Sequence, residues 1–99
     1  EPTGKIVVDE GAKKAILQKG KSLLPSGVLG TEGKFGVGDP VVLLDAAGNP
    51  FAKGLVNYAS SEIAKIRGAK TSEIEVRLGY KHHDEIVHRD DLVCSSRVC

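Results

Sequence analysis

The sequence predicts a mostly β fold with short helices, in which short strands form a compact and strongly bent sheet, a small barrel. Three observations support this prediction: the apolar runs are short, glycine and proline interrupt them often, and only a few stretches show helical spacing. The 99 residues are enough for one domain. The chain is 40% hydrophobic with a formal net charge of +1, so it should fold, and no global charge attracts a polyanion.

The N-terminal part is predicted to contain a strand, a helix and a turn. Residues 5–8 are a β-branched run that is typical of a strand, and residues 10–19 repeat small apolar side chains at helical spacing. Asp9 can cap this helix, and Gly20 can end it in the left-handed conformation. An extended segment then carries a turn over Pro25–Gly27, whose last residue is expected to be left-handed.

A hairpin and a second helix are predicted next. Residues 40–44 are a continuous apolar run, which is typical of a buried strand, and residues 51–58 return as its partner after a turn. Gly54 within the returning strand predicts a bulge or a close backbone approach. Ser60 can cap a helix that runs to Arg67.

The last third of the chain is less regular. Residues 72–78 alternate like a strand, yet Ser72 and Glu75 match a capping box, and we favour a short helix there. Residues 85–88 are predicted to form the last strand. A polar turn over residues 89–92, which its aspartates are expected to hold, follows before the tail.

We predict no catalytic, cofactor-binding or metal-binding residues in this chain. The glycines of residues 33–39 do not match a phosphate-binding loop and precede a strand rather than a helix. His82 and His83 are adjacent, so on an extended segment they point to opposite faces. Cys94 and Cys99 are expected to be free thiols, and no apolar run is long enough to span a bilayer; we therefore expect a cytoplasmic protein with no membrane partner.

A basic cluster of four lysines lies on and directly after the first predicted helix, at Lys13, Lys14, Lys19 and Lys21. Lys13 and Lys14 fall opposite the apolar stripe of the helix, so both are expected to face solvent. Such a cluster can simply keep the helix soluble. It can also contact the phosphates of RNA, because phosphate contacts supply much of the affinity for nucleic acids.

Four segments carry a family resemblance: GKIVVDEGAKKAILQKGKSLLPSGV at residues 4–28, AKGLVNYASSEIAKIRG at 52–68, EIEVRLGY at 73–80 and EIVHRDDLV at 85–93. In this order they resemble the PUA domain, and more closely the version at the C-terminus of bacterial glutamate 5-kinases. The resemblance implies a PUA-type pseudo-barrel of mixed strands over residues 4–93. Residues 1–3 would be a linker remnant, and residues 94–99 a tail that matches no pattern of the family.

The resemblance also implies partners and candidate site residues. The parent enzyme would phosphorylate the side-chain carboxylate of glutamate with ATP, the first step of proline synthesis. Its amino-acid-kinase domain, in the same polypeptide, would hold ATP and magnesium, so this chain would carry no cofactor. PUA modules meet RNA with the first helix and the adjoining loop and strand. That region corresponds here to Lys13, Lys14, Lys21, Ser22, Leu23, Pro25 and Gly27.

The sequence leaves three functions open. The chain is an accessory or regulatory domain of a metabolic kinase, a stand-alone RNA-binding module, or a protein-interaction domain that sets the oligomeric state of a homo-oligomeric enzyme. The near-zero net charge and the 4% aromatic content favour the first function. The lysine cluster favours the second.

Overall fold

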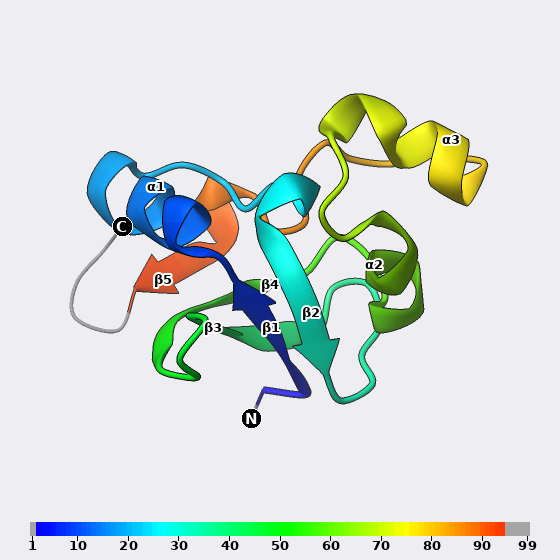
Figure 1. Ribbon diagram of the computed structural model, residues 1–99. Helices are drawn as coiled ribbons and strands as arrows, with labels where there is room; N and C mark the ends of the chain where they lie inside the picture. The colour runs from blue at the N-terminus through cyan, green and yellow to red at the C-terminus, as the bar shows by residue number, and fades with distance from the viewer. Residues whose placement is uncertain (1, 95–99) are drawn as a thin grey trace.

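A five-stranded mixed sheet lies at the centre of the structure (Figure 1). The computed structural model describes residues 2–94. The strands run in the order β2-β1-β3-β4-β5 across the sheet, with bounds β1 Gly4–Val8, β2 Val28–Glu32, β3 Pro40–Leu44, β4 Pro50–Leu55 and β5 Leu92–Cys94. β1 pairs parallel with β3, and every other neighbouring pair is antiparallel. The prediction of mixed strands with short helices is confirmed.

Three short helices pack with the sheet, namely α1 Glu10–Lys19, α2 Ser60–Ile66 and α3 Ile74–Leu78. In the view of Figure 1, α1 lies at the left of the molecule and the α2–α3 pair at the right. Three 3₁₀ turns, at Pro25–Gly27, Thr71–Glu73 and Arg89–Asp91, join these elements. Within residues 2–94, none of the helices has the length and apolar character needed to cross a membrane.

Local sequence signals set both ends of α1, as predicted. The Asp9 carboxylate accepts a hydrogen bond of 2.8 Å from the backbone N–H of Ala12, which satisfies a free donor of the first turn. Gly20 ends the helix in the left-handed conformation with φ of 60°. Ile16 is the buried anchor of the helix, and the small side chain of Ala12 lets it approach the core closely.

The second helix begins differently from its predicted cap. The N-cap is Ala59, whose N–H donates a hydrogen bond of 2.7 Å to the Glu62 carboxylate. The Ser60 hydroxyl is engaged elsewhere, because it accepts from the N–H of Phe35. The segment predicted as a helix over residues 72–78 begins as the 3₁₀ turn Thr71–Glu73 and continues as α3.

The prediction of a last strand over residues 85–88 is wrong. Ile86 and Val87 are both buried, so this stretch lacks the alternation of a half-buried strand, and only Val87 bridges to Leu23. The last strand is β5, in the stretch predicted to be turn and tail. It pairs with β4 because buried Leu92 and Cys94 alternate with exposed Val93.

Two further expectations at this end of the chain are also wrong. The turn before β5 is held by His88, whose Nδ1 accepts a 3.1 Å hydrogen bond from the N–H of Asp90. Among the described residues, the aspartate side chains make no hydrogen bond across this turn, and the Asp90 carboxylate lies 3.6 Å from the same Nδ1. Cys94 is buried in β5 and disulfide-bonded, so it is not a free thiol. The remaining residues of the predicted tail, with Cys99, lie outside the described residues, as does Glu1 of the predicted linker.

The inner face of the sheet and the three helices enclose an aliphatic core around the buried ring of Tyr58. The close approach predicted at Gly54 is confirmed. A side chain at this position would place its Cβ 2.7 Å from Val87 and 2.8 Å from the backbone oxygen of Asp91. Glycine therefore lets β4 lie directly against the segment that leads into β5.

Candidate functional site

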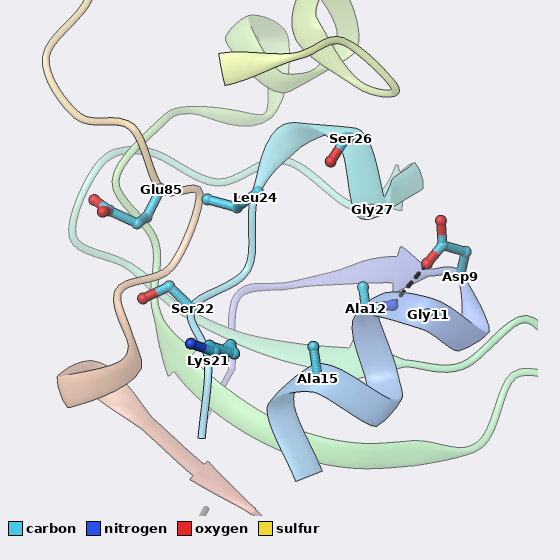
Figure 2. A pocket seen from close by; sticks show the side chains of 10 residues that line it. All are labelled: Asp9, Gly11, Ala12, Ala15, Lys21, Ser22, Leu24, Ser26, Gly27 and Glu85. Carbon is cyan, nitrogen blue, oxygen red and sulfur yellow. Dashed lines mark hydrogen bonds between the residues drawn. The ribbon is translucent and has the colours of Figure 1, made fainter. Parts of the chain in front are cut away.

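A groove of about 550 Å³ lies between α1 and the segment that follows it (Figure 2). Its lining is mostly small or polar and comes from three parts of the chain, as Asp9, Gly11, Ala12, Ala15, Lys21, Ser22, Leu24, Ser26, Gly27 and Glu85. The groove lies at the first helix and the adjoining loop, the region that the family resemblance implies for RNA contact.

The floor of the groove depends on close packing between α1 and the 3₁₀ turn. A Cβ on Gly27 would lie 2.5 Å from the Cβ of Ala12, so only glycine fits at this position. The N–H of Asp9 donates a hydrogen bond of 2.9 Å to the backbone oxygen of Gly27 and holds the two segments together. Gly27 is not left-handed, so the predicted reason for this glycine is wrong and the correct one is space.

The opposite wall comes from a segment some sixty residues away in the sequence. Leu23 exchanges backbone hydrogen bonds with this segment, donating to Val87 at 2.9 Å and accepting from Ile86 at 2.7 Å. The hydroxyl of Ser22 accepts a hydrogen bond of 2.8 Å from the N–H of Arg89. These bonds place the Glu85 side chain beside the groove, as Figure 2 shows.

Lys13 does not take the solvent-facing position predicted for it. Its Nζ lies 2.8 Å from the carboxylate of Asp45, in the turn between β3 and β4, and 5.7 Å from the ring centre of Phe51. The hydrogen bond from Lys13, together with the N–H of Asn49, lowers the pKa of Asp45 from 3.8 to about 2. The same hydrogen bond raises the pKa of Lys13. Lys13 therefore ties α1 to the sheet.

The other predicted site residues fall into three groups. Lys21, Ser22 and Gly27 line the groove. Lys14 is exposed on α1 but lies outside the lining. The side chains of Leu23 and Pro25 are buried beneath the groove, so they support its shape and do not face a ligand. The structure thus brings three of the seven predicted residues together.

Sequence reasoning missed several lining residues. Leu24 is 41% exposed, and the alternation of an extended segment around buried Leu23 could have indicated it. Ser26 follows in the turn. Asp9 lines the groove as well, although the sequence predicts it only as the cap of the first helix. Glu85 has no local signal, because only the bridge between Leu23 and Val87 brings it to the groove.

The groove presents groups that can bind a polar ligand. It presents one ammonium group, two carboxylates and two hydroxyls around a floor of glycine and alanine, and its lining holds no histidine or cysteine. The walls can therefore exchange hydrogen bonds with a polar ligand, and the flat floor lets that ligand approach the backbone closely. In residues 2–94, no group of three metal-binding side chains is close enough to hold an ion.

Comparison with known families decides the class of this domain. A sequence model described as the PUA domain matches residues 4–78. This chain belongs to the PUA domain family. A solved PUA domain of Aeropyrum pernix K1, in a tartrate complex, superposes with a TM-score of 0.63 at 28% identity, covering 87% of this chain and 41% of that one. The predicted PUA-type fold is confirmed.

The PUA domain is also similar to part of a family of longer proteins. It is 55% identical over 95 residues to a glutamate 5-kinase of Thermoanaerobacter sp. (strain X514), covering 96% of this chain and 26% of that protein. It is 58% identical over 90 residues to a glutamate 5-kinase of Syntrophotalea carbinolica, covering 91% and 24%. The chain thus spans about a quarter of the length of these relatives.

Proposed function

We propose that this PUA domain is the accessory domain of a glutamate 5-kinase, joined in the full polypeptide to an amino-acid-kinase domain. The observation that carries the proposal is identity above 50% to such enzymes over more than nine-tenths of this chain.

The kinase domain would bind ATP, magnesium and glutamate and transfer the γ-phosphate to the side-chain carboxylate of glutamate. This reaction would begin proline synthesis in the cytoplasm. The accessory domain would then regulate activity or assembly of a homo-oligomer. Phosphoryl transfer needs phosphate-binding donors and a bound metal, and these would belong to the kinase domain.

The test compares the full-length protein with a version that ends before residue 1 of this chain. Glutamate-dependent ATP turnover, oligomeric state and inhibition by proline are measured on both. We expect turnover in both proteins and a change in assembly or inhibition in the shortened one. No glutamate-dependent turnover by the full-length protein would contradict the proposal, and identical behaviour of both would contradict an accessory role.

A second candidate function is RNA binding at the α1 groove, supported by the exposed lysines around it. Lys21 lines the groove, while Lys14 and Lys19 are exposed on α1. Asp9 and Glu85 oppose a phosphate inside the groove, so phosphate contacts would fall on its rim. With Lys13 paired to Asp45, the three exposed lysines would neutralise about three phosphates, and log K against log salt should have a slope of roughly −2 to −3.

The RNA test is a titration of single-stranded and hairpin RNA into the 99-residue chain at about 50 mM salt, where non-specific binding is strongest. Lys14→Glu with Lys21→Glu should weaken binding about tenfold or more. Lys65→Glu with Lys70→Glu is the matched control, because these lysines are exposed on the α2–α3 side. No binding of either RNA, or equal weakening by both variants, would rule out this function.

A further inference from the structure

We infer that the outer face of the sheet docks against the kinase domain of the same polypeptide, an inference that rests on the proposed function. The strand registers align one row of side chains across this face. Glu32 of β2 is opposite Lys5 of β1, Lys5 is opposite Val42 of β3, Val42 is opposite Lys53 of β4, and Lys53 is opposite Val93 of β5. We call this row, with Leu55 beside it, the outer row.

The outer row is exposed and partly apolar. Val93 is 60% exposed and Leu55 is 47% exposed, and the lysines on either side of Val42 are exposed as well. Two shallow hollows of about 420 and 410 Å³ lie on either side of Val42, which lines both of them. A surface with apolar side chains, flanking charges and adjoining hollows can accept protruding side chains of a partner.

The path of the chain into the domain identifies the occupant. Thr3 donates two hydrogen bonds to the backbone oxygen of Pro40, from its N–H at 2.9 Å and from its hydroxyl at 3.2 Å. Pro2, Thr3 and Gly4 themselves line the hollow next to Val42. A domain joined before Pro2 is therefore held at this face at a high effective concentration, and relatives are about four times as long as this chain.

The charges of the outer row define the chemistry of the docking partner. The exposed Glu32 ends the row next to Lys5, but among the described residues neither Lys5 nor Lys53 has a carboxylate within 4.0 Å. A kinase-domain surface with carboxylates opposite these lysines and apolar side chains opposite Val42 and Val93 would complement the row. Val76 is 86% exposed as well, but it lies on α3, where α2 and α3 pack, and is not part of the outer row.

The test is zero-length crosslinking of the full-length protein with a carbodiimide, which joins an amine to a carboxylate only when the two are in contact. Peptide mapping should find Lys5 and Lys53 joined to carboxylates outside residues 1–99. Val93→Glu places a negative charge opposite the partner's carboxylates and should lower the yield of these crosslinks about tenfold. Val76→Glu is the matched control and should leave the yield unchanged.

Three results would overturn the inference. Crosslinks confined to lysines of the α2–α3 side, or equal loss in both variants, would place the contact elsewhere. Crosslinks between isotopically labelled and unlabelled copies would assign the face to a second copy. Glutamate-dependent ATP turnover without any crosslink at Lys5 or Lys53 would refute the docking and leave the proposed function standing, whereas absence of turnover would remove both.

Discussion

The two ends of this domain are stabilised in different ways. At the α1 end, glycine and alanine pack so closely that added volume has no room, as the contact between Gly27 and Ala12 shows. At the α2–α3 end, side-chain oxygens satisfy backbone groups. The buried Tyr58 hydroxyl accepts hydrogen bonds from the N–H groups of His82 and His83, at 3.2 and 3.0 Å, and donates to the backbone oxygen of His83.

The packing at the α1 end shapes the groove. Small side chains bring two backbone segments together there and leave a shallow surface between them. At the α2–α3 end, Glu62 and Glu73 cap their own helical turns. The α1 end should therefore be sensitive to volume, and the α2–α3 end to the loss of hydrogen bonds.

The largest effect should come from adding one methyl group at the α1 end. Gly27→Ala forces a contact with Ala12 and should lower the free energy of unfolding by about 2–3 kcal/mol in urea titrations. Gly30→Ala is the matched control, because open space surrounds that position, and it should change stability by less than about 0.5 kcal/mol.

A double-mutant cycle sharpens this test. If the clash is with Ala12, Gly27→Ala should cost clearly less in the presence of Ala12→Gly than alone. Additive losses in the cycle would show that Gly27 is required for another reason.

The next largest effect should come from Tyr58→Phe at the α2–α3 end. Removing the hydroxyl leaves the N–H groups of His82 and His83 without their partner and should cost about 1–2 kcal/mol. Amide exchange at these two residues should accelerate, while exchange in α1 stays as slow as in the wild type. Tyr80→Phe, which removes an exposed hydroxyl bonded to Glu62, should cost less than about 0.5 kcal/mol.

The smallest effect on stability at neutral pH should come from the charged contact between Lys13 and Asp45 at the α1 end. Folding lowers the pKa of Asp45 from 3.8 to about 2, so in acid the unfolded chain takes up a proton before the folded one does. The stabilisation from this carboxylate is complete above about pH 4 and should be lost as the pH falls towards 2. Denaturation at several pH values should show this decline, and Asp45→Asn should make it shallower. An unchanged acid profile in the variant would contradict this role for Asp45.

Elements whose signals lie within their own segment could be predicted from the sequence, whereas elements that depend on distant residues could not. The bounds of α1 and β3 were predicted because Asp9, Gly20 and the apolar run carry their signals locally. The last strand was misplaced because β5 depends on pairing with β4, some forty residues earlier. The alternation within β5 covers only three residues, which is too short to predict a strand from the sequence alone.

The same distinction applies to the groove. The family resemblance led to Lys21 and Ser22, which do line it. The helical pattern placed Lys13 in solvent because it contains no information on Asp45, 32 residues later in the chain. Glu85 likewise reaches the groove only through a bridge between distant segments.

The central position of β1 has a mechanical consequence. β1 lies between β2 and β3 and is hydrogen-bonded on both sides. A pull on the residues before Gly4 is therefore resisted by two ladders of hydrogen bonds, which must break together rather than peel away one at a time. The domain is thus held firmly by its first strand, and a movement of anything joined there reaches the middle of the sheet directly.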